Sequence, residues 1–148
     1  MTPAETVVAF HEALNGHDDA AFDHVAEDLI QHAAGPQGRD GLRETLATLE
    51  HDLDRPTATI HRVVAQDDLV VVHLTMNGRH VASTMPLLAG LPPTGDAVAW
   101  DFIHIWRVED DVIVEHWACR DDVGLLAQVG GWPPSISTSP PAGTDDTP

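Results

Sequence analysis

The stretch from 112 to 122, VIVEHWACRDD, begins as an apolar strand and ends in side chains that can do chemistry. Glu115, His116 and Trp117 set an acid, an imidazole and an indole side by side, and Arg120 and Asp121 follow. A carboxylate buried among aromatic rings has its pKa raised toward neutrality, which suits general acid–base catalysis. The strand either runs out into water here or lines a pocket.

A hairpin of residues 97–109 and 112–120 decides which of these side chains share a face. A two-residue turn at Asp110-Asp111 predicts a register in which one face forms a pocket wall with the Asp121 carboxylate at its rim. The predicted pairs on that face are Trp100 with Asp121, Phe102 with Cys119, His104 with Trp117, and Trp106 with Glu115. The other face would carry an Asp101–Arg120 ion pair, with Ile103 opposite Ala118 and Ile105 opposite His116. The competing interpretation is that Asp121 caps the final helix and His104 is a hydrogen-bonded core residue.

The composition excludes several kinds of chemistry and partner. The chain has no lysine for a Schiff base, no tyrosine for a phenolic oxyanion hole, and no Rossmann, P-loop or HExxH pattern. Its 7 basic and 24 acidic residues give a net charge of −17, which argues against nucleic acid and anionic membrane surfaces as partners. With no targeting or membrane-spanning segment in view, we expect a cytoplasmic protein.

The ten histidines raise the question of a metal. His61, His73 and His80 lie on one predicted hairpin around Asp67-Asp68, and its register points His61 and His73 to opposite faces. We therefore predict no metal site.

The remaining chain predicts helices first and then sheet. Thr2, Pro3 and Glu5 form a capping box that opens a helix ending at Asn15. The elements predicted after it are a short helix at 19–24, a strand at 27–32, a helix at 41–53, a hairpin of 57–66 and 69–80, a loop at 82–95, the second hairpin, and a short helix at 121–129.

This order predicts an α+β fold with a single domain at 1–132 and a disordered Pro/Ser/Thr-rich tail at 133–148. The N-terminal helices would pack on one face of a strongly curved antiparallel sheet and enclose a cone-shaped pocket. The uncovered face, with Ile103, Ile105 and Ala118, predicts a homodimer.

Several stretches resemble the SnoaL-like polyketide cyclases of the NTF2-like superfamily. They are LIQHAAG at 29–35, GRDGLRETL at 38–46, IHRVVAQDDLVVVHLTMNGRH at 60–80, GLPPTGDAV at 90–98 and IHIWRVEDDVIVEHWACRDDVGLLAQVG at 103–130. Their order and spacing cover nearly the whole predicted domain. The chain departs from the family pattern at QHAAG, where QHNP is common, and at Asp111, where glycine is usual.

The resemblance implies a dimeric α+β cone with a cofactor-free active site that closes a ring of a hydrophobic, polyketide-like substrate by intramolecular aldol condensation. It implies Asp121 as the catalytic general acid/base and places the catalytic histidine His32 at the same cavity. Substrate-binding residues would be His104, Trp117, Trp100, Phe102, His80 and Met85.

Fold is a weak guide to chemistry, so other functions stay open. The same cone could open or hydrate an epoxide, or shape a substrate for cycloaddition. It could also be a binding module without catalysis, in which Asp121 only anchors a ligand.

Overall fold

The computed structural model describes residues 1–134, and the tail predicted to be disordered lies almost entirely outside them. The elements in chain order are α1 (Pro3–Asn15), η1 (Asp19–His24), β1 (Val25–Gln31), α2 (Gly38–Asp52), β2 (Thr57–Gln66), β3 (Leu69–Arg79), η2 (Pro86–Leu88), β4 (Ala97–Glu109), β5 (Val112–Arg120) and α3 (Asp122–Gln128). Every element predicted from the sequence is present, with ends that differ by up to three residues.

The predicted capping box holds the start of α1. Thr2 accepts a hydrogen bond from the Glu5 amide at 3.1 Å, and Glu5 accepts one from the Thr2 amide at 2.9 Å. Helix α2 begins at Gly38, three residues earlier than predicted. Gln37 precedes it without a capping hydrogen bond, because its side chain is bonded to Gln31 of β1 instead.

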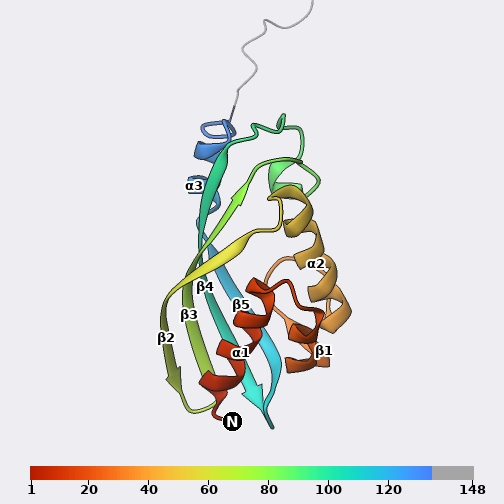
Figure 1. Ribbon diagram of the computed structural model, residues 1–148, viewed down its shortest axis with the longest axis vertical. Coiled ribbons are helices and arrows are strands. Elements are labelled where there is room, and N and C mark those ends of the chain that lie inside the picture. The colour runs from red at the N-terminus through yellow and green to blue at the C-terminus, as the bar shows by residue number, and fades with distance from the viewer. Residues whose placement is uncertain (135–148) are drawn as a thin grey trace, which may run out of the picture.

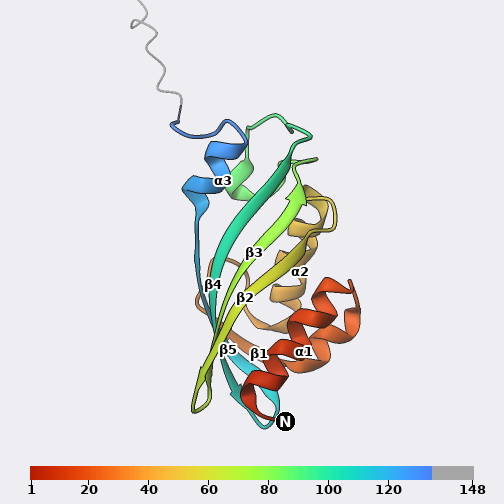
Figure 2. The ribbon, with the colours of Figure 1, turned by 60° about the vertical axis from the view of Figure 1, so that its left-hand side comes forward.

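The five strands form one sheet in the order β1-β5-β4-β3-β2. The sheet is mixed, because β1 runs parallel to β5 while the other neighbours are antiparallel. Figures 1 and 2 show the long strands bending around α1 and α2, which cover one face. The α+β fold with N-terminal helices on a curved sheet is thus confirmed, and only the all-antiparallel sheet was wrong.

The core lies between the helices and the concave face of the sheet. Val7 and Phe10 of α1 and Leu42 and Leu49 of α2 pack toward alternate residues of β3 and β4. Those inward-facing strand residues are Val70, Val72 and Leu74 on β3, and Val98, Trp100, Phe102, Trp106 and Val108 on β4. Both long strands therefore present a largely apolar face to the helices, which His104 interrupts on β4.

A β-bulge in the second hairpin changes the predicted faces. Glu109 pairs with Val112 and Val108 with Ile113, as predicted, but Arg107 then pairs with Glu115, so Val114 is an extra residue. From there on Trp106 lies opposite His116, His104 opposite Ala118, and Phe102 opposite Arg120. Because side chains alternate along a strand, this one-residue shift exchanges the two faces of β5.

A second bulge, between Ile60 and Arg62, does the same in the first hairpin. It brings the rings of His61 and His73 to a centroid distance of 4.8 Å, so the prediction that they point apart was wrong. Among residues 1–134 no three His, Cys, Asp or Glu side chains gather in a way that could hold a metal ion.

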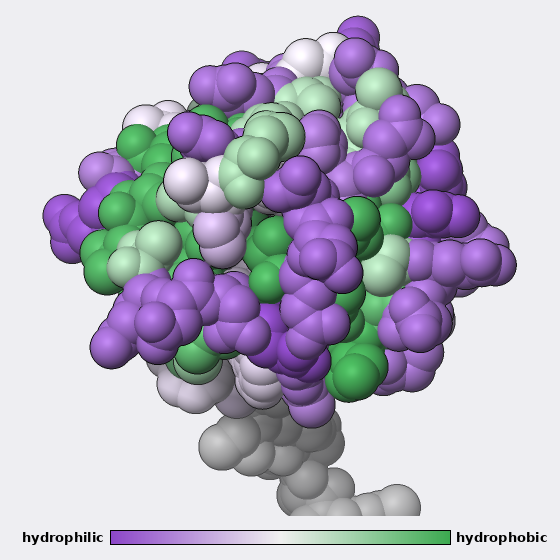
Figure 3. Space-filling model, turned by 90° about the horizontal axis from the view of Figure 1, so that it is seen from below, coloured by the Kyte–Doolittle hydropathy of each residue, from purple (hydrophilic) through white to green (hydrophobic). Residues whose placement is uncertain are grey.

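The end of the molecule at which both hairpin turns lie has a mixed surface. Figure 3 shows hydrophobic patches there that are separated by hydrophilic side chains. The turns are acidic, and Asp67, Asp110 and Asp111 have positive φ angles of 54°, 49° and 62°. Aspartate tolerates this region better than most residues, so Asp111 can stand where the family usually has glycine.

Candidate active site

A cavity lies between α1, α2 and the concave face of the sheet. Its wall is largely apolar, with Phe10 and Leu14 from α1, Leu46 and Leu49 from α2, and Leu74 and Met76 from β3. The polar side chains that interrupt it include His11, Gln31, His104, His116 and Arg120. An apolar pocket with a few convergent polar groups is the usual form of a small-molecule site.

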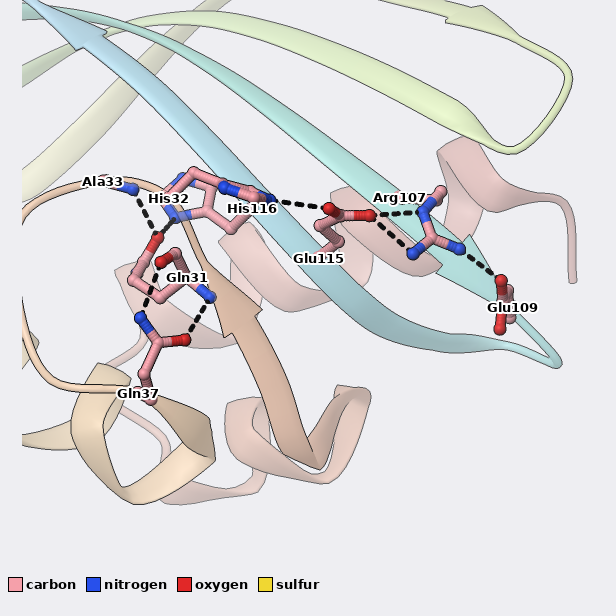
Figure 4. A network of polar contacts seen from close by, with 8 residues as sticks. All are labelled: Gln31, His32, Ala33, Gln37, Arg107, Glu109, Glu115 and His116. Atoms are coloured by element: carbon pink, nitrogen blue, oxygen red, sulfur yellow. Dashed lines mark hydrogen bonds and ion pairs between the residues drawn. The ribbon is translucent and has the colours of Figure 1, made fainter.

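Three of these polar side chains form a hydrogen-bonded chain across β1, β5 and β4. The Gln31 side-chain oxygen lies 2.8 Å from Nδ1 of His116, and Nε2 of His116 lies 2.8 Å from Nδ1 of His104. Figure 4 shows the first link of this chain, with Gln31 held by Gln37. Gln37 accepts from the Gln31 amide at 2.8 Å and donates to the Gln31 carbonyl at 2.7 Å.

The hydrogen-bonded chain of Gln31, His116 and His104 determines which nitrogen of each ring carries the hydrogen. The Ala33 amide donates to Gln31 Oε1 at 3.1 Å, so that atom is an oxygen and His116 must donate to it from Nδ1. A neutral His116 then accepts at Nε2 from the Nδ1–H of His104. Nε2 of His104 is left with its lone pair, and no side chain or backbone group among residues 1–134 donates to it.

Burial keeps these histidines neutral. It lowers the pKa of His116 to about 3, with smaller effects from His11 and His32, and the pKa of His11 to about 4. Burial, and then the neighbouring His11 and His116, also holds the pKa of His104 well below its ordinary value. His104 is therefore an unprotonated acceptor at neutral pH.

His11 of α1 has the same Nδ1–H tautomer as His104, but its hydrogen-bonded nitrogen is Nε2 and its free one is Nδ1. The Trp106 indole N–H donates to Nε2 of His11 at 3.1 Å, so a neutral His11 carries its hydrogen on Nδ1. The His11 and His104 rings are 5.7 Å apart between centroids, and both line the cavity. The site thus presents one imidazole acceptor and one imidazole donor close together.

The buried histidines predict a loss of stability in mild acid. In the unfolded chain each binds a proton near pH 6.5, but in the fold His11 does so only near 4 and His116 near 3. The unfolded chain holds more protons across that window, so the free energy of unfolding falls as the pH drops. The urea concentration at the midpoint of unfolding should be lower at about pH 5 than at about pH 7.5. Carboxylates are ionised at both pH values, so they do not account for the difference. His116→Asn should show a weaker pH dependence, and an unchanged wild-type midpoint would contradict the prediction.

Of the residues expected to bind substrate, Phe102 and His104 line this cavity. Trp100 lies on the same face but is only 1% exposed, and its indole N–H has no partner among the described residues. Trp117 lies on the convex face opposite Ile105, because of the bulge. The face predicted for β4 is therefore correct, although Trp100 does not line the cavity, and the face predicted for β5 is wrong.

Asp121 is exposed and does not line the cavity. It precedes α3 and accepts a hydrogen bond from the Gly124 amide at 2.9 Å, which is the capping role of the competing interpretation. The predicted Asp101–Arg120 pair is also absent. Asp101 accepts from Thr75 at 2.5 Å, and Arg120 instead donates to Asp122 at 3.0 Å.

His32 lies on the convex face and not in the cavity where we expected it. Parallel pairing of β1 with β5 sets Gln31 opposite His116 on the concave side, so the next residue points outward. There the His32 ring stacks on Trp117 at 4.8 Å, and Nε2 lies 2.6 Å from Glu115. Hydrogen bonds from His32 and Arg107 lower the pKa of Glu115, and Figure 4 shows this ionic chain beside the Gln31–His116 pair.

His80 and Met85 belong to the long connection between β3 and β4. His80 is fully buried, accepts from the Thr94 amide at 3.2 Å and bonds Ser83 at 2.8 Å, so it ties the two ends of that connection together. The Met85 amide donates to buried Asp52 at 2.7 Å. Met85 lines a second cavity next to the first, and His80 lines neither.

Sequence reasoning missed His11, Gln31, His116 and Arg120 as cavity residues. His11 follows the apolar Phe10 on α1, and no spacing in the sequence distinguishes it from a core histidine. The other three were assigned to no site, since the bulge and the parallel pairing that turn them inward leave no sequence signal.

Fold and cavity together define a cone-shaped α+β protein with a small-molecule pocket. The model of the SnoaL-like polyketide cyclase family matches residues 4–129, and the chain belongs to that family. The resemblance seen in the sequence is thereby confirmed.

Individual relatives agree with this assignment. The solved structure of wild-type IdmH from Streptomyces antibioticus has a TM-score of 0.76 and 30% identity, covering 88% of this chain and 99% of that one. TsrD from Streptomyces laurentii has a TM-score of 0.73 and 25% identity, covering 85% and 92%. Nogalonic acid methyl ester cyclase of Streptomyces nogalater is 33% identical over 73 residues, 49% of this chain and 52% of that enzyme. The chain thus spans about half the length of this curated relative.

None of the helices in residues 1–134 has the length and apolar character needed to cross a membrane.

Proposed function

We propose that this chain closes a ring of a polyketide-type substrate by an intramolecular aldol-type reaction in the apolar cavity, using side chains alone. The observation that carries the proposal is the Gln31–His116–His104 chain, which ends in a bare Nε2 at the cavity. The similarity to a nogalonic acid methyl ester cyclase supports a substrate of this class.

His104 is the general base in this proposal. Its Nε2 removes a proton from a carbon between two carbonyl groups, where the proton is already acidic. The resulting imidazolium keeps its Nδ1–H on His116, which holds the ring in place. Because a lowered pKa makes imidazole a weaker base, the reaction suits only such an activated carbon.

His11 supplies the complementary hydrogen bond. Its Nδ1–H can donate to the enolate oxygen as negative charge develops there, in a site from which apolar walls exclude water. The enolate carbon then attacks a carbonyl of the same chain, and the proton on His104 returns to the new alkoxide. The cavity contributes by holding the flexible substrate folded for this attack.

Asp121 remains the alternative acid/base that the family resemblance implies. If Asp121 is the catalytic group, Asp121→Asn should lower turnover by about two orders of magnitude or more while the fold survives. If His104 is the base, the same change should be nearly silent, because asparagine caps a helix about as well as aspartate. Steady-state turnover of Asp121→Asn, with exposed Asp19→Asn as a control, distinguishes the two.

We also propose that the chain forms a homodimer through the convex face of the sheet. Ile103 is 46% exposed there, and Ile105 and Trp117 lie beside it; Ala118, which was expected on this face, lines the cavity instead. Ile103→Glu should shift the protein from dimer to monomer, because it sets a charge in an apolar interface. Light scattering that finds the unaltered protein monomeric at micromolar concentration would contradict this.

A further inference from the structure

Arg120 is the one arginine among the residues that line the cavity in the described part of the chain, which has no lysine at all. The histidines of the same wall are held neutral by burial. Arg120 is therefore the permanent positive charge of the site. The chain's net charge of −17 repels anions, so an anionic ligand would depend on a local cation such as Arg120.

Strand alternation determines where this charge lies. His116, Ala118 and Arg120 follow each other on the concave face of β5, opposite Trp106, His104 and Phe102 of β4. Arg120 is thus two residues from the pair that contains His104, about 7 Å along the strand. The Phe102 ring, 5.2 Å from His104 and 4.6 Å from Trp100 between centroids, lies between the imidazole and the ring that the guanidinium covers.

The guanidinium is oriented and still has donors to spare. Its central carbon lies 5.3 Å from the centroid of the Trp100 ring, and Nη2 donates to Asp122 at 3.0 Å. Among residues 1–134 no acceptor takes up Nε or Nη1. The two side chains of the Asp122 pair are 33% and 34% exposed, and such ion pairs contribute little, so a ligand can compete for the remaining donors.

Arg120 also lines the second cavity, together with Ala34, Thr45 and Leu49, which the two cavities share. This second cavity continues to Met85, Pro86 and Leu87. A ligand longer than the first cavity would therefore pass the guanidinium on its way to the second.

We infer that Arg120 binds a carboxylate of the substrate, so that the chain acts on a free polyketide acid and not on an ester. Guanidinium matches the two oxygens of a carboxylate and holds them by charge-assisted hydrogen bonds. The inference rests on the proposed function, because it assumes that the cavity is the substrate site. It specifies a substrate whose acid group lies beyond the Phe102 ring from the reacting carbon.

Binding of two probes tests the inference without turnover. We expect 2-naphthoic acid to bind roughly tenfold more tightly than methyl 2-naphthoate, because charge-assisted hydrogen bonds are about twice as strong as neutral ones. Titration calorimetry on the full chain gives both affinities. In Arg120→Gln the acid should lose this advantage while the ester keeps its affinity, and Arg120→Lys should restore part of it.

Arg62→Gln, an exposed arginine of β2 outside both cavities, is the matched control and should retain the acid preference. Equal affinity for acid and ester, an acid preference that survives in Arg120→Gln, or no binding of either probe at millimolar concentration would each overturn the inference. His104→Asn should keep the acid preference whatever it does to turnover. A fully active His104→Asn with that preference intact would remove the proposed base and leave the carboxylate site standing.

Discussion

His104→Asn should lower turnover by about two orders of magnitude or more, the range that general acid–base assistance contributes. The asparagine amide can stand where Nδ1–H stood and donate to His116, so the hydrogen-bonded chain keeps its end. Only the bare Nε2 is removed. Affinity for a substrate or product should therefore stay within a few-fold, and the defect should appear in kcat.

The matched control is His51→Asn, which changes an exposed histidine of α2 outside the cavity. The pH profile adds a second readout. Because the pKa of His104 is held well below 6.5, kcat of the unaltered chain should stay level through pH 6.5, with any acid limb well below it. A His104→Asn variant that closes the ring at the normal rate would leave a shaped binding or cycloaddition cavity as the better interpretation.

The fold followed from local patterns that the structure leaves intact. The capping box at Thr2, the turn residues at Asp67-Asp68 and Asp110-Asp111, and the change of period after Pro56 are local signals that no tertiary contact overrode. The family resemblance then supplied the curved sheet and the pocket. What local patterns could not supply was the direction of β1, which depends on a contact between residues more than eighty positions apart.

The side chains that line the site were predicted less well, because the two faces of β5 are exchanged by one extra residue, Val114. Val114 sits in a bulge that is stabilised from both sides: Glu115 turns outward to Arg107 and His32, and His116 turns inward to Gln31. An alternating pattern read without the bulge assigned Trp117 and Asp121 to the pocket and His116 to the surface. Both faces of the strand VIVEHWACR carry apolar as well as polar side chains. Its sequence therefore favours neither register.

This coupling between the bulge and the ionic chain has a chemical consequence. The Glu115–His32–Arg107 contacts on the convex face and the Gln31–His116 contact on the concave face fix the same segment of β5. Gln31 and His116, which line the cavity, determine which nitrogen of His104 is bare, and the convex-face contacts act on it only through the position of β5. The His104 tautomer that the proposed mechanism needs therefore depends on Gln31 and His116 and not on His104 alone.

Gln31→Glu should test this directly, because it reverses the chain of hydrogen bonds with almost no change in shape. A carboxylate at this position still accepts from Ala33 and His116, but its charge favours an imidazolium at His116. That ring then donates from Nε2 to Nδ1 of His104, and the hydrogen of His104 moves to Nε2. With its hydrogen on Nε2, His104 cannot accept a proton at that atom. In the Ser-His-Asp triad the wrong histidine tautomer lowers kcat by about 10⁴.

We expect Gln31→Glu to lower turnover at least roughly tenfold, with more of the effect in kcat than in KM. Nitrogen NMR of the His104 ring should show the hydrogen on Nε2 in the variant and on Nδ1 in the unaltered chain. Gln31→Leu should be less damaging to the chemistry, because His104 is then free to adopt either tautomer, but it leaves a buried N–H unpaired at a cost of about 1–3 kcal/mol in stability. Gln66→Glu, at the exposed end of β2, controls for the added charge. Normal turnover in Gln31→Glu together with a shifted tautomer would show that Nε2 of His104 is not the base, because the hydrogen would then occupy the atom that must accept the proton.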